Sequence, residues 1–151
     1  MKNLTITIVT ALILVCAATT YAQSGNGVKP ILFANLPSTA TCPAANLRNM
    51  FRSASGDNIN LSLENNFSLS GSIISNTVKY SNLQTMIIKL PAFNNSLFSL
   101  SKQTDINNNI TYVGRIINPL YGDGFQLIST NDGNYQFIKI DLEKILVRCD
   151  Q

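Results

Sequence analysis

The sequence predicts a mainly β fold: an antiparallel meander, built as a sandwich or a small barrel, with one short N-terminal helix packed on it. Short runs rich in β-branched and aromatic residues recur along the chain, and turn sequences separate them at regular spacing. No connection is long enough to hold a crossover helix, which argues against parallel pairing. We expect about seven or eight strands.

The best-defined part is residues 110–140. Strand-like runs at 110–117 and 125–129 are joined by a glycine-containing turn, and Asn131-Asp-Gly-Asn134 then leads into a third run at 135–140. Asp-Gly between apolar runs favours a hairpin, because glycine adopts positive φ without steric cost. These runs therefore predict a three-stranded meander.

Alternating residues predict further strands upstream. In residues 59–63 and 67–73, Ile, Leu and Phe alternate with Asn and Ser, which predicts a hairpin with one buried face. Further strands are expected at 31–33, 78–80, 84–90 and 97–100.

Residues 41–52 are the predicted helix. Leu47, Met50 and Phe51 fall at i, i+3 and i+4, so they form one apolar stripe that we expect to pack on the sheet. A single helical turn is also expected at 141–146, with Asp141 as its N-cap.

The first residues predict export. Residues 1–22 carry a short positive start, an apolar run and Ala22 at the expected cleavage position, as in a cleaved signal peptide. The apolar run is too short for a stable membrane span, so no transmembrane span is expected in the mature chain. Residues 23–29 are expected to be a flexible leader and residues 30–151 a single β-rich domain. The predicted location is secreted or periplasmic.

Cys16 leaves an alternative open. It lies within the apolar run, so a lipid-modified cysteine would make the chain a membrane-anchored lipoprotein of the cell envelope. Val15 fits this alternative poorly, because lipoprotein signals carry a small residue before the cysteine.

Two cysteines remain after the predicted cleavage, Cys42 and Cys149. Export places them in an oxidising compartment, and they lie near opposite ends of the expected domain. We therefore predict a Cys42–Cys149 disulfide that ties the helix to the end of the meander.

The composition excludes several kinds of chemistry. The chain has no histidine, which rules out Ser-His-Asp and Cys-His catalysis, and it has no glycine-rich phosphate loop. The eight carboxylates show no spacing that selects a catalytic pair. We expect no enzyme activity, no cofactor and no metal, since Asp123 and Asp132 occupy turns that serve the backbone. The net charge of +3 is too small to predict nucleic-acid binding.

The predicted binding site lies around residues 120–124. Tyr121 would supply contact area beside a polar turn, Asp123 a hydrogen-bond acceptor, and Arg115 a charged edge. The predicted function is that of an exported, non-enzymatic binding or accessory domain that recognises a protein or polysaccharide partner through loops on a β-scaffold. Inhibition of an exported hydrolase is the alternative, since small size and a disulfide also fit that class.

Overall fold

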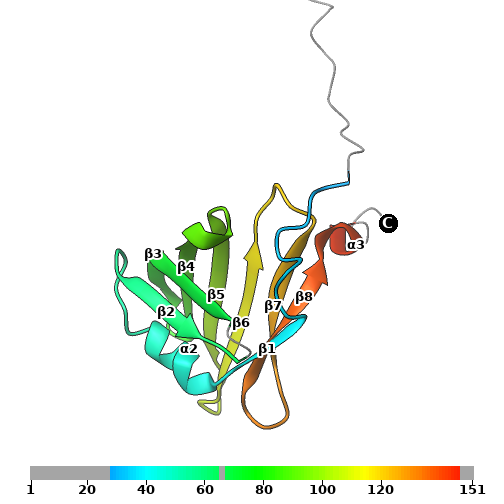
Figure 1. Ribbon diagram of the computed structural model, residues 1–151. Helices are drawn as coiled ribbons and strands as arrows, with labels where there is room; N and C mark the ends of the chain where they lie inside the picture. The colour runs from blue at the N-terminus through cyan, green and yellow to red at the C-terminus, as the bar shows by residue number, and fades with distance from the viewer. Residues whose placement is uncertain (1–27, 65–66, 147–151) are drawn as a thin grey trace, which may run out of the picture.

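A single antiparallel sheet curls into an open half-barrel (Figure 1). The computed structural model describes residues 28–64 and 67–146, and within them the sheet has eight strands. In chain order these are β1 (Thr39–Cys42), β2 (Asn58–Ser62), β3 (Ser68–Tyr80), β4 (Leu83–Leu90), β5 (Ser96–Thr104), β6 (Ile110–Ile117), β7 (Asp123–Ser129) and β8 (Tyr135–Asp141). The mainly β, antiparallel class is confirmed, whereas a sandwich is wrong because there is one sheet and not two.

Two strands that follow one another in the chain lie at opposite edges of the sheet. The strand order is β1-β8-β7-β6-β5-β4-β3-β2, so β2 to β8 form a continuous meander and β1 adds to the last strand. The strands β1 and β2 are therefore the two edges. The chain leaves one edge at the end of β1 and starts the meander at the other, so the segment between them must cross the open side of the half-barrel.

The expectation of one short N-terminal helix needs correction. The described chain has two short α-helices, α2 (Ala44–Met50) between the edges and α3 (Leu142–Leu146) at the C-terminal end, besides the 3₁₀ helix η1 (Pro91–Phe93). Because β1 takes the first residues of the predicted helix, α2 is shorter than 41–52. The side chain of Asp141 accepts backbone hydrogen bonds at the start of α3, as the sequence predicted for an N-cap.

The strand predictions differ in outcome. The meander over residues 110–140 is confirmed as β6, β7 and β8, and Gly133 in its second turn has φ +77°. The hairpin of residues 59–63 and 67–73 is confirmed as β2 and β3. The expected strand at 31–33 is wrong, because this segment forms bends that place Phe33 in the core instead of pairing with the sheet.

The concave face of the sheet holds the hydrophobic core, which aromatic rings fill at both ends. Phe33 from the N-terminal segment contacts Phe93 and Phe125, with ring centroids 5.5 and 5.2 Å apart. At the other end, Phe51 stacks on Tyr112 with centroids 5.8 Å apart. Both rings that enter from outside the sheet are buried, so the half-barrel is filled by the N-terminal segment at one end and by the α2 region at the other.

Asp123 attaches the N-terminal segment to the sheet. Its Oδ1 accepts the backbone N–H of Leu32 at 2.8 Å, and its Oδ2 accepts that of Phe33 at 2.9 Å. Asp123 is only 4% exposed, so these two bonds provide partners for a buried carboxylate as well as for one buried and one partly buried donor.

Cys42 lies at the end of β1 and is fully buried. Among the described residues it is a free thiol, so the structure shows no disulfide at this position. Cys149, the predicted partner, lies outside the described residues, as does Cys16. Burial raises the pKa of the Cys42 thiol to about 12.

Replacing Asp123 by Ala should lower the free energy of unfolding by about 3 kcal/mol, because one buried and one partly buried N–H group lose a charged acceptor. Urea denaturation measures the loss, and Glu64→Ala, which removes an exposed carboxylate, serves as the control. A loss no larger than that of the control would show that the N-terminal segment is held by apolar packing alone.

Native Cys42 should resist alkylation by iodoacetamide at pH 8, because a thiol with a pKa of about 12 is almost entirely protonated there and is buried. Peptide mapping by mass spectrometry, before and after unfolding in urea, measures its modification. We expect modification only after unfolding. Rapid labelling of the folded chain would contradict the buried position, and a Cys42–Cys149 peptide under non-reducing conditions would establish the predicted disulfide.

Candidate binding groove

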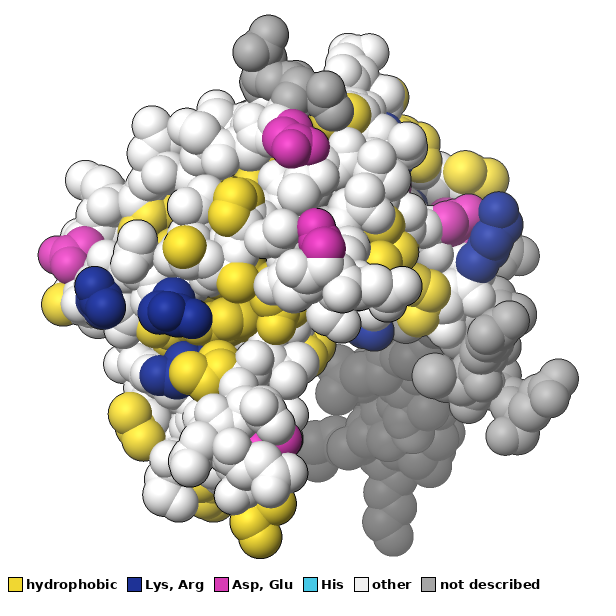
Figure 2. Space-filling model, turned by 90° about the horizontal axis from the view of Figure 1, so that it is seen from below, with side chains coloured by type: hydrophobic (Ala, Val, Ile, Leu, Met, Phe, Trp, Pro, Cys, Tyr) yellow, Lys and Arg dark blue, Asp and Glu magenta, His cyan; other side chains and the backbone are white. Residues whose placement is uncertain are grey.

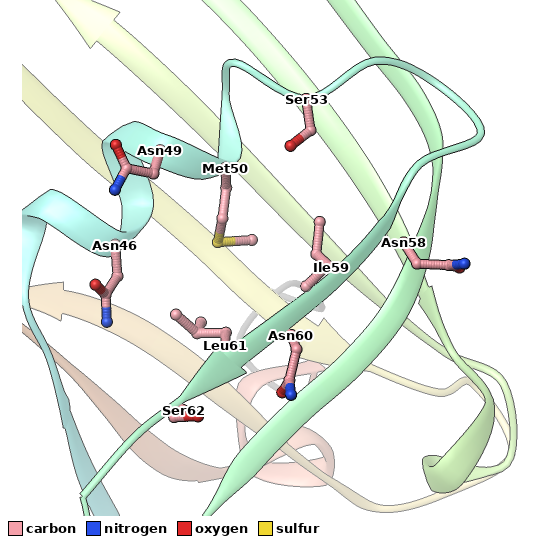
Figure 3. A pocket seen from close by; sticks show the side chains of 9 residues that line it. All are labelled: Asn46, Asn49, Met50, Ser53, Asn58, Ile59, Asn60, Leu61 and Ser62. Carbon is pink, nitrogen blue, oxygen red and sulfur yellow. The ribbon is translucent and has the colours of Figure 1, made fainter.

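A hollow in the described surface lies between α2 and the edge strand β2 (Figure 3). Its volume is about 440 Å³, within the range of ligand sites in proteins. Three of the lining side chains are apolar, and the others are polar but uncharged. The full set of lining residues is Asn46, Asn49, Met50, Ser53, Asn58, Ile59, Asn60, Leu61 and Ser62. We call this hollow the α2–β2 groove.

The apolar side chains of the groove meet in the space between helix and strand. Figure 3 shows Met50 extending from α2 toward Ile59 and Leu61 of β2. These three side chains belong to the hydrophobic core and are nearly fully buried, so the floor of the groove is the outer layer of the core. The asparagine and serine side chains surround this floor and supply amide and hydroxyl groups.

Two side-chain amides on the sheet fix the C-terminal end of α2. Asn76 donates to the carbonyl oxygens of Phe51 at 3.3 Å and Ser53 at 2.7 Å. Gln84 donates to the side-chain oxygen of Asn76 at 2.9 Å. Carbonyl groups at a helix end have no partner within the helix, so these amides both satisfy them and set the position of α2 relative to the sheet. The width of the groove depends on this attachment.

The backbone of β2 presents hydrogen-bonding groups to the groove. Next to the strand, the N–H of Leu63 donates to the backbone carbonyl oxygen of Phe67 at 2.8 Å, and the N–H of Ile73 donates to that of Asp57 at 2.9 Å. In an antiparallel pair, hydrogen-bonded positions alternate with positions whose backbone groups point away. The odd-numbered residues of β2 therefore bond to β3, and the even-numbered ones direct N–H and C=O to the free side. These are Asn58, Asn60 and Ser62.

The edge formed by β2 lacks the usual protection against pairing. Exposed edges in proteins are commonly blocked by lysine, proline or a bulge. Asn-Ile-Asn-Leu-Ser has neither residue, and its five pairs with β3 follow one another without a register shift. The opposite edge, β1, has only four residues and lies between Pro37 and Pro43. Of the two edges, β2 is thus the one that the described residues leave open to another strand.

The residues of the predicted loop site lie elsewhere and in different surroundings. Tyr121 is half-buried, and its hydroxyl bonds to the side chain of Asn94. Arg115 is exposed on β6, on the convex face between Ser99 and Gln126 of the adjacent strands. Asp123 is buried and uses both oxygens within the chain, so its carboxylate is not presented to a partner. A binding role of Tyr121 and Arg115 stays a prediction.

The carboxylates of the turns also serve the backbone. Asp132 accepts hydrogen bonds from Thr130 and Asn134, which lower the pKa of its carboxyl to about 2. Within residues 28–64 and 67–146, no three His, Cys, Asp or Glu side chains lie close enough to hold a metal ion. No helix in the same part of the chain is long and apolar enough to span a membrane.

Comparison of the chain with protein-family models, with curated proteins and with solved structures finds no match. The groove must therefore be interpreted from its own geometry.

Sequence reasoning missed the groove residues. The alternation at 58–62 correctly predicts which side chains of β2 are buried, but the same pattern occurs in a central strand. The absence of lysine and proline from these five residues was the available indication of an open edge. Whether a strand is an edge depends on the connectivity of the whole sheet, which local patterns do not contain.

Amide hydrogen exchange tests the orientation of the β2 backbone without a ligand. We expect the amides of Asn58, Asn60 and Ser62 to exchange roughly 100-fold faster than those of Ile59 and Leu61, because only the latter donate to β3. Residue-resolved exchange measured by NMR gives the rates. Equal protection along β2 would contradict a free edge.

Proposed function

We propose that this protein is an exported, non-enzymatic binding domain that takes an extended segment of a partner polypeptide as an additional strand on β2. The free backbone groups at Asn58, Asn60 and Ser62 carry this proposal, because they match the groups of an extended peptide at every second residue. The added segment would lie in the α2–β2 groove.

The shape of the groove restricts the partner. The helix α2 forms the wall opposite β2, so the site admits one strand and not the edge of a second folded sheet. The partner segment is therefore a flexible stretch of chain that becomes extended on binding. No charged side chain occurs among the described residues that line the groove, so affinity should depend little on salt.

The lining chemistry favours a polypeptide over a polysaccharide at this groove. The set of lining residues contains no aromatic ring on which a sugar could stack. The geometry also differs from that of an inhibitor of hydrolases, which inserts a segment of its own into the target, whereas the α2–β2 groove receives one. Unpaired N–H and C=O groups along an edge strand are the feature by which proteins recognise extended chains.

Export is proposed on the N-terminal sequence alone. Residues 1–22 have the pattern of a cleaved signal peptide, which supports a secreted or periplasmic location and a partner in that compartment. A lipid anchor at Cys16 would leave the groove unchanged and would place the same domain at a membrane surface.

Two substitutions at one position test the proposal. Peptides selected from a random display library on the native protein serve as probes. Asn60→Pro removes the free N–H and should weaken peptide binding more than about tenfold, while β2 keeps its bonds to β3. Asn60→Ala keeps the N–H and should bind within about twofold of the native protein, because the backbone carries recognition.

Circular dichroism and thermal melting of both variants show whether they fold. Equal loss in both variants would assign recognition to the Asn60 side chain, and no loss in either would place the peptide elsewhere. Either result contradicts strand addition at β2.

A further inference from the structure

A second, smaller cavity lies at the β3–β4 hairpin, apart from the α2–β2 groove. Its volume is about 190 Å³, and most of its lining side chains are polar. The lining residues are Val78, Tyr80, Ser81, Asn82, Leu83, Gln84, Lys102 and Thr104. The hairpin belongs to the lower end of the sheet in Figure 1. Figure 2 views the molecule from that side, where Lys and Arg side chains gather beside exposed hydrophobic ones.

Lys102 is the one charged residue among those that line this cavity. It is half-buried, and its Nζ donates to the side-chain oxygen of Gln84 at 3.4 Å and lies 5.9 Å from the centre of the Phe51 ring. Within the described chain the ion pair is Lys144–Asp141, so Lys102 has no carboxylate partner there. An ammonium group has three donors, and the contact with Gln84 uses one of them. An anionic ligand group would pair with the charge and accept from the remaining donors.

Tyr80 lies at the rim of the same cavity and is 70% exposed. It precedes the two-residue turn of Ser81 and Asn82, so its position follows from the hairpin and not from packing in the core. A large exposed aromatic ring beside a hollow is a feature of binding surfaces. The hydroxyl and amide groups of Ser81 and Asn82 lie next to the Tyr80 ring. A sugar ring has one apolar face, which would pack on the aromatic ring, and several hydroxyl groups, which would bond to these polar groups.

We propose that the β3–β4 hairpin cavity binds a sugar that carries a carboxylate, with the carboxylate on Lys102 and one face of the ring on Tyr80. One cation in the cavity matches one negative charge. The volume is smaller than that of most ligand sites, which fits a single sugar unit. Gln84 lines this cavity and also helps to hold α2, but Lys102 and Tyr80 do not line the α2–β2 groove. Failure of strand addition at β2 would therefore leave this proposal intact.

Titration of the full chain with galacturonic acid, galactose and acetate, followed by NMR at the Ser81 and Asn82 amides, tests the proposal. We expect galacturonic acid to bind at least tenfold more tightly than either galactose or acetate. Trigalacturonic acid then shows whether a chain of such units binds more tightly than the single sugar. Equal affinity for the acid and galactose would overturn the charge recognition, and equal affinity for the acid and acetate would overturn the sugar recognition.

Variants locate the site. Lys102→Gln should abolish the preference for the acid over galactose, and Lys102→Arg should keep it. Lys89→Gln removes the same charge from an exposed position on β4 outside the cavity and should change nothing. Tyr80→Ala should weaken galacturonic acid at least fivefold with no loss of folding, since the ring is exposed. Unchanged binding in Tyr80→Ala, or an equal loss in Lys89→Gln, would overturn the assignment.

Discussion

The two edges of the sheet do not meet, and this constraint shapes the rest of the molecule. Because β1 pairs with β8 while β2 begins the meander at the other end, the chain between them must cross the open side of the half-barrel. The crossing segment contains α2, whose Leu47, Met50 and Phe51 enter the core that the open sheet would otherwise expose. At the opposite end, Phe33 fills the core in the same way and is held by Asp123.

The α2–β2 groove is a consequence of this crossing. A closed barrel would pair β2 with β1 and leave no free backbone groups. Here α2 lies beside β2, where a closed barrel would have a neighbouring strand. The helix contacts the core through its side chains and does not hydrogen-bond to the backbone of β2. Asn76 and Gln84 fix the helix at its C-terminal end. The edge is thus open, yet its access is limited to the width between strand and helix.

Sequence patterns predicted the local structure well and the long-range structure poorly. Alternation gave the β2–β3 hairpin, and Asp-Gly gave the turn before β8, because both depend on neighbours along the chain. The pairing of β1 with β8 joins residues more than 90 positions apart in the chain, and the four alternating residues of β1 are too short a pattern to specify a partner strand. The role of Asp123 was missed for the same reason. A turn was expected at this residue, but its hydrogen bonds with Leu32 and Phe33 depend on the folded position of a segment remote in the sequence. A loop site was therefore predicted where the structure has an internal attachment.

An NMR structure of the protein with a selected peptide tests the central claim most directly. In an antiparallel addition, the residues of β2 that bond to β3 form the close, non-bonded pairs with the new strand. The account predicts Hα–Hα contacts from Ile59 and Leu61 to the peptide, together with slowed exchange of the Asn58, Asn60 and Ser62 amides. Peptide contacts confined to β1, to the convex face or to the Tyr121 loop would contradict it.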